Sequence, residues 1–216
     1  MASKNYSGQA AAARAIVEIG RRMYSRGFVA ANDGNISCRL RGGQILITPT
    51  GVSKGFMRPE MLVLLNADGT PASGGVATSE VKMHLRVYQE NPRLRAVVHA
   101  HPPISTAHAA CGLALDKPIL TEVLMLLGPI PLVPYAAPGS DDLPEALAPF
   151  VQGHNGALLA NHGALSWGRD LFEAWSRLES MEHYARISLY SGLLGGGVPI
   201  PDEEQERLRR MRKKNA

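Results

Sequence analysis

Two histidines, His99 and His101, directly follow a short apolar run and precede two prolines. The run, residues 96–98, is too short for a helix of its own and is typical of a buried strand. Side chains alternate across an extended chain, so both imidazoles would project from one face at the strand's end. Such a pair can bind one metal ion, but it also occurs with no ligand. The pair by itself leaves both interpretations open.

His162 is the best-placed candidate for a third ligand, because a catalytic metal site usually combines three protein ligands with an open position. It follows the apolar run 157–160 and precedes Gly163, and glycine lets the backbone turn sharply or come close beside a ligand. A hydrogen-bonded loop histidine is the alternative. We expect His84 to pack or to support the site rather than to bind metal, and we assign no role to His108, His154 and His183.

Glu80 is the candidate acid–base residue, and it stands beside Thr78 and Ser79 at the start of an expected helix. A glutamate there could simply stabilise the helix dipole, by roughly 0.3–1 kcal/mol. The free amides of a helix N-terminus also attract anions. Two polar turns, residues 32–35 and 48–51, add backbone amides and small side chains. The three segments could together cradle a phosphate, although turns rich in Gly and Asn are usually only turns.

The rest of the sequence supplies the elements that would position these groups. Apolar residues at helical spacing, with capping and stop signals, predict helices at residues 9–25, 80–90, 103–111, 141–151 and 170–191, followed by a charged C-terminal helix. Strands are predicted at residues 36–40, 44–48, 61–65, 96–101, 130–133, 157–160 and 164–167. Residues 117–127 fit a strand or a helix. Strands that alternate with helices but include a hairpin favour a mixed α/β layered fold around a largely antiparallel sheet.

The composition is that of an ordinary globular protein, with 45% hydrophobic and 19% charged residues in a chain of 216. We therefore expect one domain over residues 1–216. No apolar run approaches the roughly 20 residues that cross a bilayer, and residues 1–9 lack an apolar signal segment. With only Cys38 and Cys111, a disulfide framework is not expected, so we predict a cytoplasmic protein with no membrane partner.

The net charge of +4 depends on six basic side chains in the basic C-terminal tail, residues 202–216, because the remaining chain sums to −2. Its basic side chains are Arg207, Arg209, Arg210, Arg212, Lys213 and Lys214. A patch that binds nucleic acid would normally come with a fold or with aromatic residues that read it, and neither accompanies this tail. We interpret it as a solvated helix end or a frayed terminus. Binding of phosphorylated metabolites or of a neighbouring subunit's acidic groups is the alternative.

Five polar motifs occur in a distinctive order along the chain. They are Gly34-Asn-Ile-Ser37, Thr48-Pro-Thr-Gly51, Thr78-Ser-Glu80 with His84, His99-Ala-His101 and Asn161-His-Gly163. In this order they resemble the class II aldolase/adducin family, and the resemblance covers about residues 10–194. It implies a three-layer αβα fold around a central, mostly antiparallel sheet, and a homotetramer with active sites between subunits.

By this resemblance the zinc ligands fall on His99, His101 and His162, with Mn²⁺ or Co²⁺ as alternative metals. The catalytic carboxylate falls on Glu80, which would also ligate the resting metal. The phosphate contacts fall on Gly34, Asn35, Thr50, Gly51, Thr78 and Ser79. The implied reaction is zinc-dependent cleavage of a phosphorylated sugar, a ketose 1-phosphate, to dihydroxyacetone phosphate and an aldehyde. In it, the metal would act as a Lewis acid and Glu80 would move a proton.

The sequence departs from the related ketose-1-phosphate aldolases in one respect. Those enzymes use a tyrosine from a neighbouring subunit to protonate the aldehyde oxygen, but residues 121–128 contain none, and neither does the segment after Tyr190. We expect Val123, Leu124, Met125 and Leu126 to form an apolar aldehyde pocket, suited to a deoxy- or methylthio-pentulose 1-phosphate, with fuculose 1-phosphate as the other candidate. Packing of a core or a subunit interface is the alternative role of these four residues.

Other activities of the superfamily stay open. The related sugar-phosphate 4-epimerases resemble this chain but carry aspartate where Glu80 stands, so Glu80 favours aldol cleavage. A metal-dependent dehydratase or decarboxylase would keep the carboxylate. A non-catalytic, adducin-like interaction module would be expected to lack metal ligands that this sequence retains.

Overall fold

A computed structural model describes residues 8–215, with side chains described up to residue 212. The strands are β1 (Asn35–Arg39), β2 (Ile45–Ile47), β3 (Val63–Leu65), β4 (Pro71–Ser73), β5 (Ala96–Ala100), β6 (Leu132–Val133), β7 (Gly156–Leu159) and β8 (Gly163–Gly168). The α-helices are α1 (Gln9–Ser25), α2 (Val81–Glu90), α3 (Pro103–Ala110), α4 (Asp142–Val151), α5 (Leu171–Leu193) and α6 (Asp202–Asn215). Three short helical segments are η1 (Lys54–Phe56), η2 (Pro59–Met61) and η3 (Val123–Leu127), the last of them π-helical.

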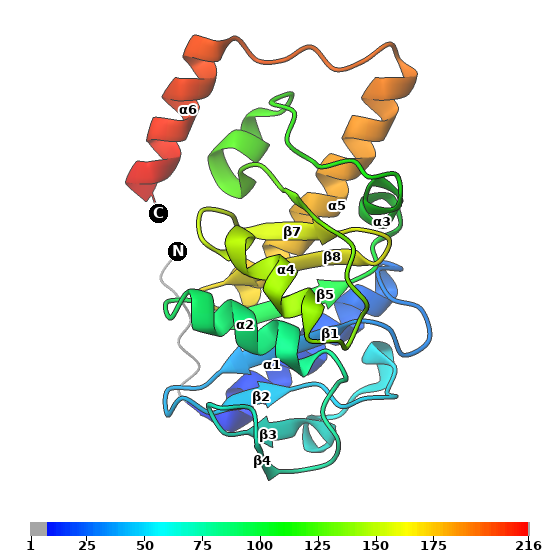
Figure 1. Ribbon diagram of the computed structural model, residues 1–216, viewed down its shortest axis with the longest axis vertical. Coiled ribbons are helices and arrows are strands. Elements are labelled where there is room, and N and C mark those ends of the chain that lie inside the picture. Colours follow the sequence, from blue (N-terminus) through cyan, green and yellow to red (C-terminus); the bar gives the residue numbers. More distant parts are fainter. Residues whose placement is uncertain (1–7, 216) are drawn as a thin grey trace.

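The strands form one sheet in the order β4-β3-β2-β1-β5-β8-β7-β6. Neighbouring strands are antiparallel except for β6 and β7, which are parallel. Helices α2 and α4 cover one face of the sheet, and α1 and α5 lie behind the other (Figure 1). The expected three-layer αβα fold around a mostly antiparallel sheet is therefore confirmed.

Strand β5 lies at the centre of the sheet and is buried on both faces. Val98 packs into the core beneath α1 and α5, whereas Val97 packs into the core beneath α2 and α4. Because side chains alternate along a strand, His99 points to the same side as Val97. The neighbouring strand β1 places Asn35 directly beside His99 and Ser37 directly beside Val97. The side of the sheet that α2 covers thus carries the polar residues His99, Asn35 and Ser37.

The longest helix begins where the sequence predicts. The carboxylate of Asp170 accepts a hydrogen bond from the backbone amide of Glu173 at 2.8 Å and so caps α5. The helix then buries a stripe that includes Leu171, Trp175 and Leu178 against the sheet. It continues two residues beyond the expected end at 191.

Three parts of the fold differ from, or refine, the expectations. The run 117–127, which fitted a strand or a helix, ends in η3. Segment η3 packs against both α5 and α6, which explains why its apolar residues show no single periodicity. Strand β4 was not anticipated, because all three of its residues are exposed and it begins with proline. The strand predicted from residue 61 begins at Val63, because the preceding residues form η2.

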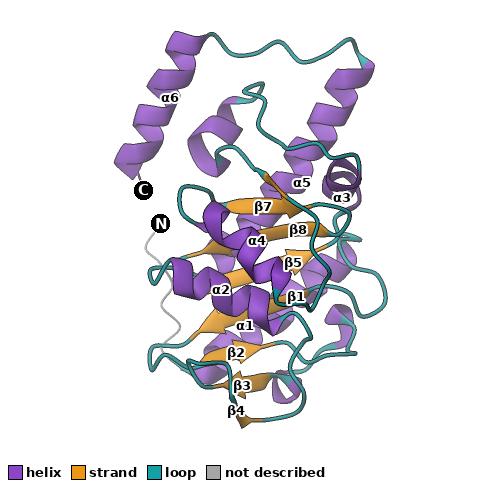
Figure 2. Ribbon diagram, viewed as in Figure 1, coloured by secondary structure: helices purple, strands orange, loops and turns teal. Residues whose placement is uncertain are grey.

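The C-terminal segment is a helix rather than a frayed end. A long loop joins α6 to α5 (Figure 2), and α6 packs against η3. Burial lowers the pKa of the Arg212 guanidinium, which lies against Gly128. The side chains of Lys213 and Lys214 lie outside the described residues. Cys38 and Cys111 are both free, and none of the described helices is long and apolar enough to cross a membrane.

Candidate active site

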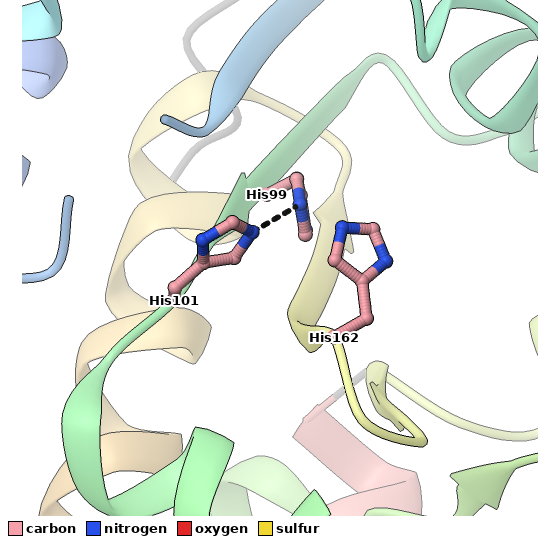
Figure 3. Close-up of side chains that lie close together, drawn as sticks. All are labelled: His99, His101 and His162. Atoms are coloured by element: carbon pink, nitrogen blue, oxygen red, sulfur yellow. Dashed lines mark hydrogen bonds between the residues drawn. The ribbon is translucent and has the colours of Figure 1, made fainter. Parts of the chain in front are cut away.

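Three histidines meet at one end of the central strands (Figure 3). His99 belongs to β5, His101 directly follows it, and His162 lies in the tight connection between β7 and β8. One ring nitrogen from each of the three lies within 4.8 Å of the other two. The structure therefore brings together the three residues that were predicted from the sequence as metal ligands.

The backbone beside His162 is shaped for this close approach. Asn161 adopts a left-handed conformation with φ of 56°, which only a minority of side chains tolerate. A Cβ atom on Gly163 would lie 2.6 Å from Cδ2 of His101 and 2.7 Å from the carbonyl oxygen of Ala100. Position 163 thus needs glycine because no side chain fits between β8 and the histidines, as the sequence suggested.

The protonation of His99 leaves a lone pair directed at its neighbours. Its Nδ1 lies 3.0 Å from the carbonyl oxygen of Ala164, and a carbonyl can only accept, so Nδ1 carries the ring proton. Burial lowers the pKa of His99 to about 3, so the ring is neutral at pH 7 and its Nε2 is unprotonated. That Nε2 lies 3.2 Å from Nε2 of His101, whose Nδ1 is 3.4 Å from the Asp33 carboxylate.

Glu80 completes the cluster of possible ligands. Its Oε2 lies 3.3 Å from Nε2 of His99, and its Oε1 lies 3.3 Å from Nε2 of His162. Both Oε1 of Glu80 and Nδ1 of His162 are buried with no hydrogen-bond partner among the described residues. Facing imidazole nitrogens and a partnerless carboxylate oxygen are the donor set that a divalent cation such as zinc would satisfy. The residues present therefore fit a metal ion.

Glu80 immediately precedes α2 and is held in its ionised form. Burial raises the pKa of its carboxyl group, but electrostatic interactions with the His99 and His162 rings and a hydrogen bond from Asn35 outweigh this and lower the pKa to about 2. The Asn35 amide donates that bond to Oε2 at 2.8 Å. The ionised carboxylate is the form that can accept a proton.

A cavity of about 170 Å³ opens beside Glu80 and His101. The six residues expected to contact phosphate, Gly34, Asn35, Thr50, Gly51, Thr78 and Ser79, all line it. Gly34 has φ of 72°, and a Cβ atom there would lie 2.8 Å from the carbonyl oxygen of His99. The turn at residues 32–35 is thus pressed against the histidine strand, and the cavity joins the polar turns to the metal ligands.

Two residues of this site were missed by the sequence reasoning, Lys54 and Asp33. Lys54 is only 1% exposed, and its Nζ donates to the carbonyl oxygens of Asn32 at 2.8 Å and Val52 at 2.6 Å. It therefore ties the two polar turns together, and burial lowers its pKa to about 8. Asp33 lies inside a turn that the sequence singled out, whereas Lys54 belongs to no motif and gives no periodic signal.

The remaining histidines do not join the cluster. His84 is fully buried and contacts Asn35 and Ser37, which supports the expectation of a role behind the ligands. Nδ1 of His108 bonds to the carbonyl of Ile104, and Nδ1 of His154 to that of Phe150.

The apolar run 123–126 is not brought to the Glu80 cavity within one chain. Val123 and Leu124 are buried in η3. Met125 and Leu126 line a second cavity, of about 510 Å³, together with Arg93, Arg177 and Arg212. The expected aldehyde pocket is therefore not formed by the described residues of a single chain.

Comparison with known proteins agrees with this geometry. Residues 14–189 match the family described as the class II aldolase and adducin N-terminal domain. The 3-oxo-tetronate 4-phosphate decarboxylase of Escherichia coli strain K12 is 37% identical over 182 residues, which cover 82% of this chain and 85% of the relative. The L-fuculose phosphate aldolase of Methanococcus maripaludis is 35% identical over 172 residues, covering 80% of this chain and 93% of the relative.

The fold is also found in solved structures. The crystal structure of YgbL from Escherichia coli, described as a candidate aldolase, epimerase or decarboxylase, superposes with a TM-score of 0.88 at 33% identity. The match covers 93% of this chain and 99% of YgbL.

Proposed function

The chain belongs to the class II aldolase and adducin family, and from that premise we propose that it is a metal-dependent lyase that decarboxylates a phosphorylated 3-oxo sugar acid. The proposal is supported by the similarity to the 3-oxo-tetronate 4-phosphate decarboxylase. Among the reactions expected from the sequence, it takes the decarboxylase alternative in preference to aldol cleavage. The expected homotetramer and cytoplasmic location remain part of the proposal.

The chemistry of such a substrate matches the groups in the cavity. In a 3-oxo acid the bond between C1 and C2 breaks, CO₂ leaves, and the electron pair stays on C2, where it is conjugated with the C3 carbonyl. One proton must then be added to C2, and for a four-carbon substrate the products are CO₂ and dihydroxyacetone phosphate. Glu80 is placed to relay that proton from solvent, since its Oε1 has no competing hydrogen-bond partner.

The other residues bind and orient the substrate. His99, His101 and His162 would hold a divalent ion that supplies Lewis-acid stabilisation of negative charge on oxygen. Glu80 would ligate the ion only before substrate binds, so that its Oε1 then serves proton transfer. Zinc fits this donor set, with Mn²⁺ or Co²⁺ as alternatives. The phosphate would bind between the turn at residues 48–51 and the segment Thr78-Ser79, where hydroxyl groups and backbone amides line the cavity and the charge of Lys54 lies close by.

One observation carries the choice of decarboxylation: the absence of a second acid–base group where related aldolases have a tyrosine. In aldol cleavage the hydroxyl of the departing carbon must lose a proton as the aldehyde forms, so a base is needed there as well as at Glu80. Departing CO₂ needs none. Segment η3, with the sequence Val-Leu-Met-Leu-Leu, offers no such group. A site to which η3 adds no acid–base group beside Glu80 fits loss of CO₂ better than loss of an aldehyde.

Aldol cleavage of a ketose 1-phosphate is the second candidate, because one relative is an L-fuculose phosphate aldolase. Both reactions leave the same three-carbon fragment and require the same proton transfer. They differ in the group that departs. A neighbouring subunit in the expected tetramer would then have to supply the second acid–base group, and the deoxy- or methylthio-pentulose 1-phosphates would be the substrates to test.

The test compares the efficiency of CO₂ release with that of aldehyde release. Purified protein loaded with Zn²⁺, Mn²⁺ or Co²⁺ is given 3-oxo-tetronate 4-phosphate, L-fuculose 1-phosphate or 5-deoxyribulose 1-phosphate. We expect CO₂ from the first substrate with a higher kcat/KM than aldehyde release from the others. Higher efficiency on either ketose 1-phosphate would overturn the decarboxylase assignment in favour of the aldolase. The Glu80→Gln variant, inactive on all three, serves as the control for contaminating enzymes.

A further inference from the structure

A continuous line of buried side chains runs from Glu80 into the protein, away from the cavity. Asn35 bonds Oε2 of Glu80 at 2.8 Å, and Oδ1 of Asn35 lies 2.5 Å from Nε2 of His84. Nδ1 of His84 lies 2.8 Å from Oγ of Ser37, which in turn lies 2.7 Å from the hydroxyl of Tyr88. Asn35, Ser37, His84 and Tyr88 are each at most 4% exposed. Water therefore does not compete for these bonds.

The line arises because strand β1 and helix α2 lie side by side and each carries polar residues at a similar spacing along its axis. Asn35 and Ser37 are two residues apart on β1, so they share one face of the sheet. Glu80, His84 and Tyr88 are four residues apart at and along α2, so they share one face of the helix. Two strand residues and four helix residues both span roughly 6–7 Å. The polar groups of the two elements can therefore alternate along the line.

The direction of each bond can be assigned from the Glu80 end. An ionised carboxylate only accepts, so the group that Asn35 presents to Oε2 must be its NH₂. The same NH₂ also faces Oγ1 of Thr78 at 3.2 Å. The carbonyl Oδ1 of Asn35 is then left facing His84, and because it only accepts, Nε2 of His84 must carry a proton.

The rest of the line follows from the single proton of a neutral imidazole. Burial lowers the pKa of His84 to about 4, consistent with a neutral ring. With the proton on Nε2, Nδ1 is an acceptor, so the Ser37 hydroxyl must donate to it. The Ser37 oxygen then accepts from the Tyr88 hydroxyl. Every donor from Tyr88 to Glu80 points the same way, towards the carboxylate.

We propose that His84, Ser37 and Tyr88 form a positioning relay that fixes the Asn35 amide against Oε2 of Glu80 and so reserves Oε1 for proton transfer. Oε1 lies on the side of His162 and has no hydrogen-bond partner among the described residues. The three relay residues act through Asn35 and do not touch the substrate. The proposal rests on the proposed function, because it assigns Glu80 the acid–base role.

The relay matters because a carboxylate can rotate and exchange its two oxygens. A donated hydrogen bond stabilises charge on Oε2 and makes that oxygen the weaker base, which leaves Oε1 as the stronger one. If the His84 ring turned over or changed tautomer, Oδ1 of Asn35 would lose its donor and the amide could flip. The NH₂ would then no longer face the carboxylate.

The first test concerns the resting protein and needs no substrate. Nitrogen NMR of protein labelled with ¹⁵N-histidine distinguishes the two neutral tautomers, and His84→Gln identifies the signal. We expect the proton of His84 on Nε2, with an Nδ1 signal that shifts in Ser37→Ala because that nitrogen loses its donor. A proton on Nδ1 of His84 in the wild-type protein would overturn the relay, whatever reaction the protein catalyses.

The second test measures proton transfer separately from the departing group. Dihydroxyacetone phosphate is incubated with metal-loaded protein in D₂O, and exchange at its hydroxymethyl carbon is followed by NMR. Loss of a donor to a buried acceptor predicts that kcat for exchange falls about tenfold to a hundredfold in Ser37→Ala, with KM little changed. Ser37→Cys, which keeps a weak donor, should recover part of the rate, and Tyr88→Phe should have the smallest effect.

The matched control removes another buried tyrosine hydroxyl. Tyr184 on α5 donates to the carbonyl oxygen of Lys117 and has no contact with the line, so Tyr184→Phe should leave exchange unchanged. Equal exchange rates in Ser37→Ala and Tyr184→Phe would overturn the relay. Exchange without CO₂ release would refute the decarboxylase assignment and leave the relay standing. If the wild-type protein exchanges no proton at all, the tautomer of His84 still decides the bond directions.

Discussion

The two ends of the active-site cavity are built from different parts of the chain. At the end proposed to bind metal, called the metal end below, the candidate ligand atoms are side-chain nitrogens and oxygens, carried by the buried strand β5, by the β7–β8 connection and by Glu80. At the anion end the cavity is lined largely by two turns, residues 32–35 and 48–51, in which Gly34 and Gly51 have φ of 72° and 71°. One end depends on which side chains are present, the other on how the backbone is bent.

This difference predicts how each end should respond to substitution. Removing a ligand at the metal end deletes a group that no neighbour can replace. At the anion end the backbone amides remain when a side chain is removed, so the sensitive positions should be those that hold the turns in shape. Lys54 is the clearest of these, because its ammonium group bonds to Asn32 in the first turn and to Val52 directly after the second.

The largest effect is expected for His99→Ala, which removes a fully buried ligand from the metal end. Loss of the Lewis acid, which is worth several kcal/mol, should lower kcat/KM by about a thousandfold or more. Elemental analysis should show loss of the bound metal. The control is His108→Ala, a histidine bonded only to its own helix, which should retain both metal and activity. Metal retained in full by His99→Ala would contradict the ligand assignment.

Glu80→Gln should come next, because it keeps the shape of the side chain but removes its basicity. We expect a loss of about a hundredfold or more in kcat, the usual contribution of general acid–base catalysis. Metal content should fall less than in His99→Ala, since the three histidines remain. Proton exchange into dihydroxyacetone phosphate is the measurement, and unchanged exchange would remove Glu80 from the acid–base role.

Acidification should destabilise the metal end of the metal-free protein. The pKa of His84 is lowered to about 4 and that of His99 to about 3, from an ordinary value of 6.5, so the unfolded chain takes up these protons first. Their contribution to stability is complete above pH 6.5 and is lost as the pH falls towards 4 and then 3. Urea unfolding across this range should show the loss, and His84→Gln should flatten it. An unchanged slope in that variant would show that His84 is not buried in its neutral form.

The smallest effect of this series is expected at the anion end. Lys54→Met removes the link between the two segments and should weaken binding of inorganic phosphate by about tenfold, a loss comparable to one hydrogen bond to a charged group. The matched control is Lys82→Met, an exposed lysine paired with Asp141 outside the cavity. Isothermal titration with phosphate measures both variants. Equal affinity in the two variants would show that Lys54 does not shape the anion end.

The clustering of His99, His101 and His162 could be predicted from the sequence once the order of the motifs indicated the family, although the spacing of the histidines by itself left their role open. His99 and His101 stand at the end of an apolar run, and His162 stands between another such run and a glycine that proves sterically necessary. The helices α1 and α5 could also be predicted, because each buries one regular stripe of apolar residues.

The anion end was only half predictable, for a physical reason. Its glycines and asparagines predict turns. The contact of Lys54 with Asn32 and Val52, however, depends on how two separate segments pack together, and a local sequence pattern does not predict that. Segment η3 and strand β4 escaped prediction in a similar way. Segment η3 packs against α5 and α6 but leaves the apolar Leu126 67% exposed, so its sequence does not separate a buried face from a polar one. Strand β4 is an exposed edge strand with no apolar alternation.

The most direct test of the central claim is to follow the carboxyl carbon. 3-Oxo-tetronate 4-phosphate labelled with ¹³C at C1 is mixed with the protein, with and without divalent metal, and labelled CO₂ and dihydroxyacetone phosphate are measured together. Decarboxylation by this site predicts the two products in equal amounts, only with metal, and about a hundredfold or more slowly from Glu80→Gln. No labelled CO₂ from metal-loaded protein that cleaves a ketose 1-phosphate to an aldehyde, or CO₂ release that needs neither metal nor Glu80, would contradict it.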